Sequence, residues 1–141
     1  MRRIVRSAVG ICCLVTLLPG ALQAQGGVKS ALGLADLIEK VEPSCVRVDV
    51  TTAKGGSIGS GFIVNEAGWV ATNHHVVAGG LSATVSFADK TVAPVEGVLA
   101  YDKRRDLALI KIKTDRKLKA LPLAKEKPRK GENSVAIGAP V

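Results

Sequence analysis

Val46-Arg47-Val48-Asp49-Val50 alternates apolar and charged side chains one by one. A period of two puts the three valines on one face of a β-strand and the two charges on the other, so the stretch predicts a strand with one buried face. Aromatic residues make up only 3% of the 141-residue sequence. A core around this strand would therefore be built from Val, Ile, Leu and Ala, and such β-branched richness favours a sheet protein.

Six further segments after this stretch are typical of strands, and short turn-forming pieces rich in Gly, Asn and Asp separate most of them. They are Ser57–Val64, Gly68–Thr72, Ser82–Phe87, Val92–Ala100, Asp106–Ile112 and Ser134–Ile137. Six or seven short strands at this spacing are typical of a small barrel or sandwich. The sequence therefore predicts an all-β domain.

One short amphipathic helix is expected ahead of the strands, over Ala31–Val41. Leucine and isoleucine side chains recur there at nearly helical spacing, with charged residues between them. Pro43 follows closely, and a proline biases the residue before it away from the helical conformation. We therefore expect the helix to end near Val41 and the first strand to begin shortly afterwards.

The first 24 residues are typical of a secretory signal. A positive segment with Arg2, Arg3 and Arg6 leads into an apolar stretch, Ala8–Leu18, and Ala24 offers a cleavage site. The apolar stretch is shorter than the roughly 18–20 residues that span a bilayer. We therefore expect cleavage and an exported protein, periplasmic or secreted, with no membrane span afterwards. An uncleaved membrane anchor is the alternative.

The mature chain would then consist of a flexible leader, residues 25–30, and one domain, residues 31–141. Cys12 and Cys13 would leave with the signal, so Cys45 would be the single cysteine and no internal disulfide could form. Cys45 is expected to fill a small apolar space. A reactive thiol is the alternative, although no paired base lies near it in the sequence.

Basic residues gather in one stretch, residues 103–130, which holds 12 Lys and Arg against 3 Asp and Glu. Such a stretch can steer a protein towards an anionic surface or nucleic acid. No aromatic side chains alternate with the lysines, so bases would find no stacking platform and we expect no specific nucleic-acid partner. The simpler interpretation is a solvated strand pair and loop. An exported protein that binds an anionic polymer is the alternative.

Two adjacent histidines, His74 and His75, follow the apolar run Trp69–Ala71. A histidine at the end of a buried strand can be held with its ring facing a cleft, and its unperturbed pKa near neutrality suits a general base. The alternatives are a hydrogen-bonded histidine without chemistry and a zinc ligand. A metal site is not expected, because adjacent side chains diverge and no third ligand follows at the usual spacing.

Asp106 opens an apolar strand and lies 31 residues after His75. A carboxylate in that place can accept a hydrogen bond from a histidine Nδ1–H, which fixes the ring tautomer and stabilises the charged imidazolium. The alternative is a strand-edge aspartate that pairs with Arg104 or Arg105. Neither the histidines nor the aspartate would decide the function alone.

Four motifs occur in order along the chain. They are Gly59-Ser-Gly-Phe-Ile-Val64, Thr72-Asn-His-His-Val-Val77, Asp106-Leu-Ala-Leu-Ile110 and Val135-Ala-Ile-Gly-Ala-Pro140. Together they resemble the first barrel of a trypsin-like serine protease of the HtrA/DegP-like branch. Val41–Val48 is likewise similar to the N-terminal helix and first strand of that family. The resemblance implies a six-stranded antiparallel β-barrel, the first of the usual two, preceded by a short N-terminal helix.

The resemblance also implies a serine endopeptidase whose catalytic residues include His75 and Asp106. The family's Thr-Asn-x-His-Val pattern places the base at His75 and leaves His74 at the variable position. The resemblance further implies that the catalytic site needs no cofactor and no metal. It also implies protein or peptide substrates and is compatible with a homo-oligomer.

The family's nucleophile segment, Gly-Asn-Ser-Gly-Gly in the second barrel, has no counterpart in these 141 residues. Ser134 is the only serine after Asp106 and occupies an ordinary strand position, while Ser57 and Ser60 belong to the Gly-Ser-Gly strand. We therefore expect a chain truncated before the second barrel and inactive as given. The alternative is a non-catalytic, protease-like binding or regulatory module of the cell envelope.

Overall fold

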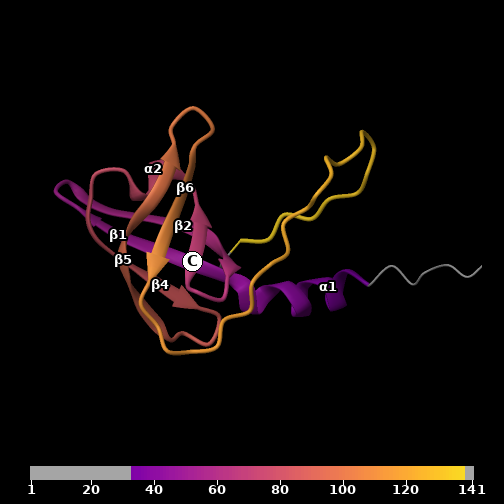
Figure 1. The fold of residues 1–141 in the computed structure, drawn as a ribbon, viewed down its shortest axis with the longest axis horizontal. Coiled ribbons are helices and arrows are strands. Elements are labelled where there is room, and N and C mark those ends of the chain that lie inside the picture. Colours follow the sequence, from indigo (N-terminus) through magenta and orange to yellow (C-terminus); the bar gives the residue numbers. More distant parts are fainter. Residues whose placement is uncertain (1–32, 139–141) are drawn as a thin grey trace, which may run out of the picture. The chain divides into compact units, whose positions relative to one another are not determined.

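The computed structural model describes residues 33–138, so the expected signal and leader lie outside the described residues. Its elements, in chain order, are α1 (Leu34–Val41), the 3₁₀ turn η1 (Glu42–Ser44), β1 (Cys45–Thr52), β2 (Gly55–Asn65), β3 (Trp69–Thr72), α2 (His74–Val77), β4 (Gly80–Phe87), β5 (Val92–Asp102) and β6 (Leu107–Ile112) (Figure 1). Within this part of the chain, no helix is long and apolar enough to cross a membrane.

The six strands close into one antiparallel barrel, in the order β1-β2-β3-β6-β5-β4 (Figure 1). β1 pairs with β2 along one edge and with β4 along the other, and the pairing of β3 with β6 joins the two halves of the chain. The predicted six-stranded antiparallel barrel with a short helix before it is therefore confirmed.

One predicted strand, Ser134–Ile137, is wrong. These residues form neither helix nor strand, and Val135 is 47% exposed. Each strand of the closed barrel already has a neighbour on both sides. A closed barrel offers no free edge, so an apolar segment that follows it finds no strand to pair with.

The valines of β1 form the centre of the core, as their alternation predicts. Val46 and Val48 are fully buried, and Val50 is 3% exposed. Fully buried aliphatic side chains from β2, β3, β4 and β6 pack around them: Ile63, Val70, Val85, Ile110 and Ile112. Burying one such side chain contributes about 1.5–3 kcal/mol, so the barrel gains its stability mainly from branched aliphatic residues.

Gly59 of β2 lets α2 pack directly on the barrel. A Cβ atom at this position would lie 2.4 Å from Cγ2 of Val76, the buried residue of α2. We expect Gly59→Ala to lower the free energy of unfolding by about 1–3 kcal/mol, because the added methyl group overpacks this contact. Gly97→Ala in β5 is the matched control, since a Cβ there meets nothing within 4 Å. Urea unfolding measures both variants, and equal effects would contradict the close contact.

The chain after β6 runs over residues 113–138 without helix or strand, and several of its residues contact the barrel. The main-chain N–H of Leu121 donates to the carbonyl oxygen of Ile63 at 2.9 Å. The guanidinium of Arg116 lies over the Phe87 ring, 4.2 Å from its centroid, and pairs with Asp89 at 3.0 Å. These contacts hold the segment against the barrel.

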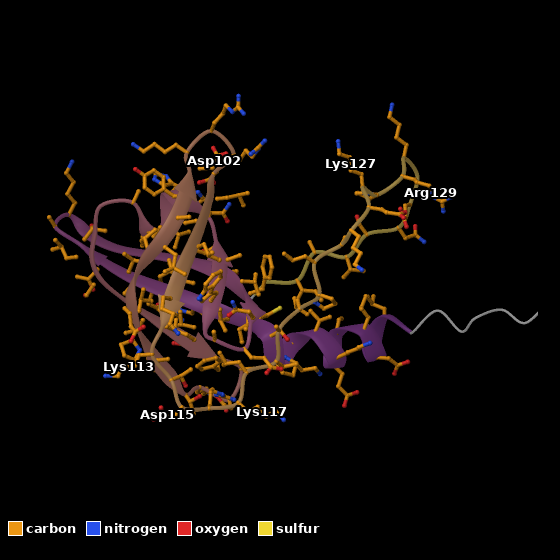
Figure 2. The ribbon with its side chains drawn as sticks, in the orientation of Figure 1. Asp102, Lys113, Asp115, Lys117, Lys127 and Arg129 are labelled. Carbon is orange, nitrogen blue, oxygen red and sulfur yellow. The ribbon has the colours of Figure 1, made fainter. Side chains whose placement is uncertain are left out.

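The basic stretch, residues 103–130, lies on the surface. Its lysines and arginines are all exposed except Lys111, which is half-buried and donates from Nζ to the carbonyl oxygen of Ala67. Lys127 and Arg129 lie on a loop that extends away from the barrel (Figure 2). The arrangement agrees with the interpretation of these charges as a solvated surface.

Cys45 opens β1, and its side chain is buried. Burial raises the pKa of its thiol, and the carboxylate of Glu42 raises it further. Both effects disfavour the thiolate, which is the reactive form. The surroundings of Cys45 therefore suit an apolar filler better than a reactive thiol.

Candidate active site

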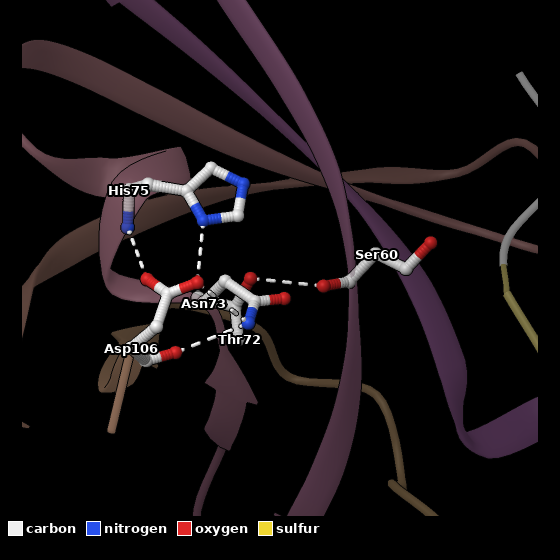
Figure 3. Close-up of polar contacts among 5 residues, drawn as sticks. All are labelled: Ser60, Thr72, Asn73, His75 and Asp106. Carbon is white, nitrogen blue, oxygen red and sulfur yellow. Dashed lines mark hydrogen bonds and ion pairs between the residues drawn. The ribbon is translucent and has the colours of Figure 1, made fainter. Parts of the chain in front are cut away.

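The pairing of β3 with β6 brings the two candidate motifs to the same end of the barrel. Thr72, the last residue of β3, pairs with Ala108 of β6. Because the strands are antiparallel, the residues just after Thr72 lie beside those just before Ala108. The Thr72 hydroxyl also donates to the carbonyl oxygen of Ser60 at 2.9 Å, which ties this corner to β2 (Figure 3).

Both histidines lie on α2, a single helical turn, and not at the end of a strand as the sequence suggested. Asn73 is still extended, with φ −80° and ψ 143°, and the helical turn begins directly after it. The N–H of Ala78 donates to the carbonyl oxygen of His74 at 2.9 Å and closes the turn. Val76 is buried against the barrel, so its neighbour His75 is carried by an anchored element.

His75 and Asp106 meet through two contacts. Nδ1 of the His75 ring lies 2.6 Å from Oδ2 of Asp106, and the main-chain N–H of His75 donates to Oδ1 at 2.9 Å (Figure 3). An ionised carboxylate only accepts hydrogen bonds, so Nδ1 must carry the ring proton. In the neutral ring, the second nitrogen, Nε2, then has a lone pair that can accept a proton.

Asp106 adopts an unusual backbone conformation for a residue other than glycine, with φ of 53°. Its N–H donates to the carbonyl oxygen of Lys103 at 3.3 Å, so it ends the turn between β5 and β6. The His75 main-chain N–H, followed by the His75 ring, lowers the pKa of the Asp106 carboxyl. The carboxylate is thus held in its charged form by the residue that it orients.

Among the described residues, the ion pair of Asp106 is with His75, and neither Arg104 nor Arg105 pairs with it. Arg105 donates to Asp102 instead, at 3.2 Å from Nη1 to Oδ2. His74 packs its ring on Tyr101, with 5.1 Å between the ring centroids. Of the two adjacent histidines, His75 is the one bonded to Asp106.

The pair lies at an open surface. The His75 side chain is 70% exposed and that of Asp106 is 42% exposed. The three serines considered above lie elsewhere: Ser57 and Ser60 on β2, and Ser134 in the segment after β6. Figure 3 shows the Ser60 hydroxyl directed away from the His75 ring. Among residues 33–138, no group of three or more His, Cys, Asp or Glu could hold a metal ion.

Sequence reasoning missed one residue of this site, Asn73. Its side-chain Nδ2 lies 3.1 Å from the carbonyl oxygen of Asp106 and 3.2 Å from Oδ2 of the same residue. The signal was present in the sequence, because Asn73 stands two residues before His75 in the Thr-Asn-x-His pattern. Its bonding partner lies 33 residues away along the chain, and no local pattern indicates such a contact.

Comparisons with known proteins agree with this geometry. The model of the trypsin-like peptidase domain matches residues 59–141. Serine protease HTRA1 of Xenopus laevis is 36% identical over 115 residues, which cover 76% of this chain and 25% of that protein. The anti-sigma-I factor RsgI9 of Acetivibrio thermocellus is 41% identical over 83 residues, covering 58% of this chain and 12% of that protein.

A solved structure gives the same result for the fold. The HtrA-type protease AlgW with a tripeptide is 28% identical and superposes with a TM-score of 0.59, covering 64% of this chain and 29% of that one. The chain spans about a quarter of the length of the HTRA1 relative that it matches. The motifs, the closed barrel and these matches together show that the chain belongs to the trypsin-like peptidase domain family, in its HtrA-type branch.

Proposed function

We propose that this chain carries the histidine and the aspartate of a serine endopeptidase, with His75 as general base and Asp106 as the carboxylate that orients it. The observation that carries the proposal is the double contact of Asp106 with His75, at 2.6 Å to Nδ1 and 2.9 Å to the main-chain nitrogen. The first contact fixes the tautomer, and the second bonds the other carboxylate oxygen to the main chain of the same residue.

The chemistry follows from this arrangement. With its proton on Nδ1, His75 accepts the hydroxyl proton of a serine nucleophile at Nε2 and becomes an imidazolium. Asp106 stabilises that charge at 2.6 Å without taking the proton itself. The same Nε2–H then protonates the leaving amine of the cleaved peptide bond.

The proposed substrates are proteins or peptides in the periplasm or outside the cell. HTRA1 is named a serine protease, and the AlgW structure contains a tripeptide. Residues 1–24 are proposed to be a signal, residues 25–30 a flexible leader and residues 31–141 the first barrel of the protease domain. A periplasmic or secreted location follows from the proposed signal.

The nucleophile is proposed to come from outside these residues, because no Gly-x-Ser-Gly sequence occurs among them. Reading the gene beyond the codon for Val141 tests this directly. A Gly-x-Ser-Gly segment in the same frame, within the length of one further barrel, supports the proposal. An uninterrupted coding sequence without it would contradict the serine mechanism.

The proposed activity can be tested by comparing the complete gene product, read through beyond Val141 and called the intact protein below, with residues 25–141 alone. We expect a fluorescent fluorophosphonate probe to label the intact protein, which should also hydrolyse an unfolded protein substrate. The shorter piece should do neither, because it lacks the nucleophile and the groups that bind the tetrahedral oxyanion. Label on the shorter piece would mean that one of its own serines reacts, and the assignment of roles would be wrong.

A non-catalytic binding or regulatory module is the second candidate. The observation in its favour is the 41% identity to RsgI9, a protein named for regulation of a sigma factor. Under this reading, residues 25–141 should be soluble and monomeric and melt cooperatively, and the intact protein should bind no fluorophosphonate. The labelling experiment therefore separates the two candidates.

A further inference from the structure

Helix α2 begins with an exchange of hydrogen-bonding partners. An asparagine just before a helix normally accepts a hydrogen bond from the second or third helical N–H. Asn73 occupies that place, yet its side chain makes no such bond. The N–H of His75, the second helical residue, donates instead to Oδ1 of Asp106 at 2.9 Å. Asp106 therefore caps α2 in place of Asn73. The Asn73 side chain remains available to bond another group.

The Asn73 side-chain amide bonds Asp106 instead of the helix. Nδ2 lies 3.1 Å from the carbonyl oxygen of Asp106 and 3.2 Å from its Oδ2 (Figure 3). Both partners are acceptors, so the amide must present its nitrogen to them. A flipped amide would place its oxygen against two other oxygens. The amide group thus bonds the main chain and the side chain of one residue at once.

Asp106, the residue bonded by Asn73, has a backbone conformation that costs free energy. Asp106 has a φ of 53°, in the left-handed region that residues other than glycine enter at a cost. Its N–H makes only a long bond of 3.3 Å to the carbonyl oxygen of Lys103. Asn73 adds a bond to the opposite end of the residue, at its carbonyl oxygen. It thereby restrains the rotation that would swing the carboxylate away from His75.

We propose that Asn73 is the positioning residue of this site, which holds the Asp106 backbone and Oδ2 in line with Nδ1 of His75. This inference rests on the proposed roles of His75 and Asp106. Asn73 acts through Asp106, so its removal affects the proton transfer more than substrate affinity. We expect Asn73→Ala in the intact protein to lower kcat about 10- to 100-fold, with KM nearly unchanged.

A second substitution separates hydrogen-bond donation from shape. Asn73→Leu keeps nearly the size of the side chain but removes the donor and adds no charge beside the Asp106 carboxylate. If Asn73 acts by donation, the leucine variant should lose about as much activity as the alanine variant. If Asn73 only fills space, the leucine variant should keep most of the activity, and the inference is overturned. His74→Ala is the matched control, because that ring packs on Tyr101 and not on Asp106.

A readout that needs no activity is the His75 Nδ1–H proton, followed by NMR with ¹⁵N-labelled histidine and assigned by its disappearance in His75→Ala. The signal should persist in His74→Ala. In Asn73→Ala it should move upfield and exchange faster with water, because the acceptor is less well aligned. If Asn73→Ala retains both kcat and this signal, the inference is wrong while the proposed function stands. If His75→Ala retains activity, the proposed function is wrong, whatever the proton shows.

Discussion

His75→Ala in the intact protein should lower kcat for peptide hydrolysis by about 10⁶-fold, whereas His74→Ala should leave it nearly unchanged. The physical reason is that His75 is the ring bonded to Asp106, at 2.6 Å. Without an imidazole at that position, a serine hydroxyl has no group to take its proton. The His74 ring packs against Tyr101 and makes no bond to Asp106, so we expect no part for it in the transfer.

Steady-state kinetics with one quenched fluorescent peptide measure both variants. Thermal unfolding of each variant serves as the control for folding. His74 is half-buried and His75 is exposed, and neither belongs to the buried core. Equal losses from the two substitutions would show that the register of the Thr-Asn-x-His pattern has been misassigned. Loss of kcat in His74→Ala alone would mean that His74, and not His75, is the general base.

Asp106→Asn should lower kcat by about 10⁴-fold while the protein remains folded. Asp106 accepts two bonds from His75, one from the main-chain N–H and one from the ring. An asparagine has a single side-chain oxygen, and the main-chain N–H cannot rearrange, so that oxygen is expected to turn towards it. The amide NH₂ then faces Nδ1 and forces the ring proton onto Nε2. In this tautomer His75 cannot act as a base.

Asp102→Asn is the matched control for the neighbouring turn, because Asp102 pairs with Arg105 and not with a histidine. We expect little loss of activity from it. ¹⁵N NMR of the histidine ring should show the tautomer change in Asp106→Asn and not in Asp102→Asn. A full loss of activity with the tautomer unchanged would mean that Asp106 acts by its charge alone.

The same substitution has a predicted pH dependence. The pKa of Asp106 lies below its ordinary value of 3.8, with the His75 main-chain N–H as the largest cause. A carboxyl with a lowered folded pKa stabilises the fold above its ordinary pKa, and that contribution is lost as the pH falls through the folded value. The difference in unfolding free energy between wild type and Asp106→Asn should therefore be constant above about pH 5 and shrink in acid. Urea unfolding at a series of pH values measures it.

Much of the fold could be predicted from local patterns. The alternation of Val46, Val48 and Val50 indicated both the strand and the face that is buried, because side chains along a strand point alternately to its two sides. Ser134–Ile137 has similar composition but forms no strand. Pairing depends on a free edge, and the closed barrel has none. Composition near the end of a barrel therefore cannot decide whether a segment is a strand.

The site was predictable in part. The resemblance indicated His75 and Asp106, whereas the residues alone left His74 equally eligible and offered arginines as partners for the aspartate. Asn73 could not be assigned to the site from the sequence, because its bonding partner lies 33 residues away along the chain. Its actual bond is to Asp106, and it depends on the exchange of caps at α2.

The sequence by itself determined the six barrel strands, the buried face of β1 and the family, since side-chain period and motif order are properties of the chain alone. The tertiary structure decided which histidine meets the aspartate and what holds that aspartate. The pairing of Thr72 with Ala108 brings the start of α2 beside Asp106, and the buried Val76 fixes how the helical turn is rotated. Residue type alone leaves two adjacent histidines equivalent, but on one anchored turn His75 is the one that bonds Asp106.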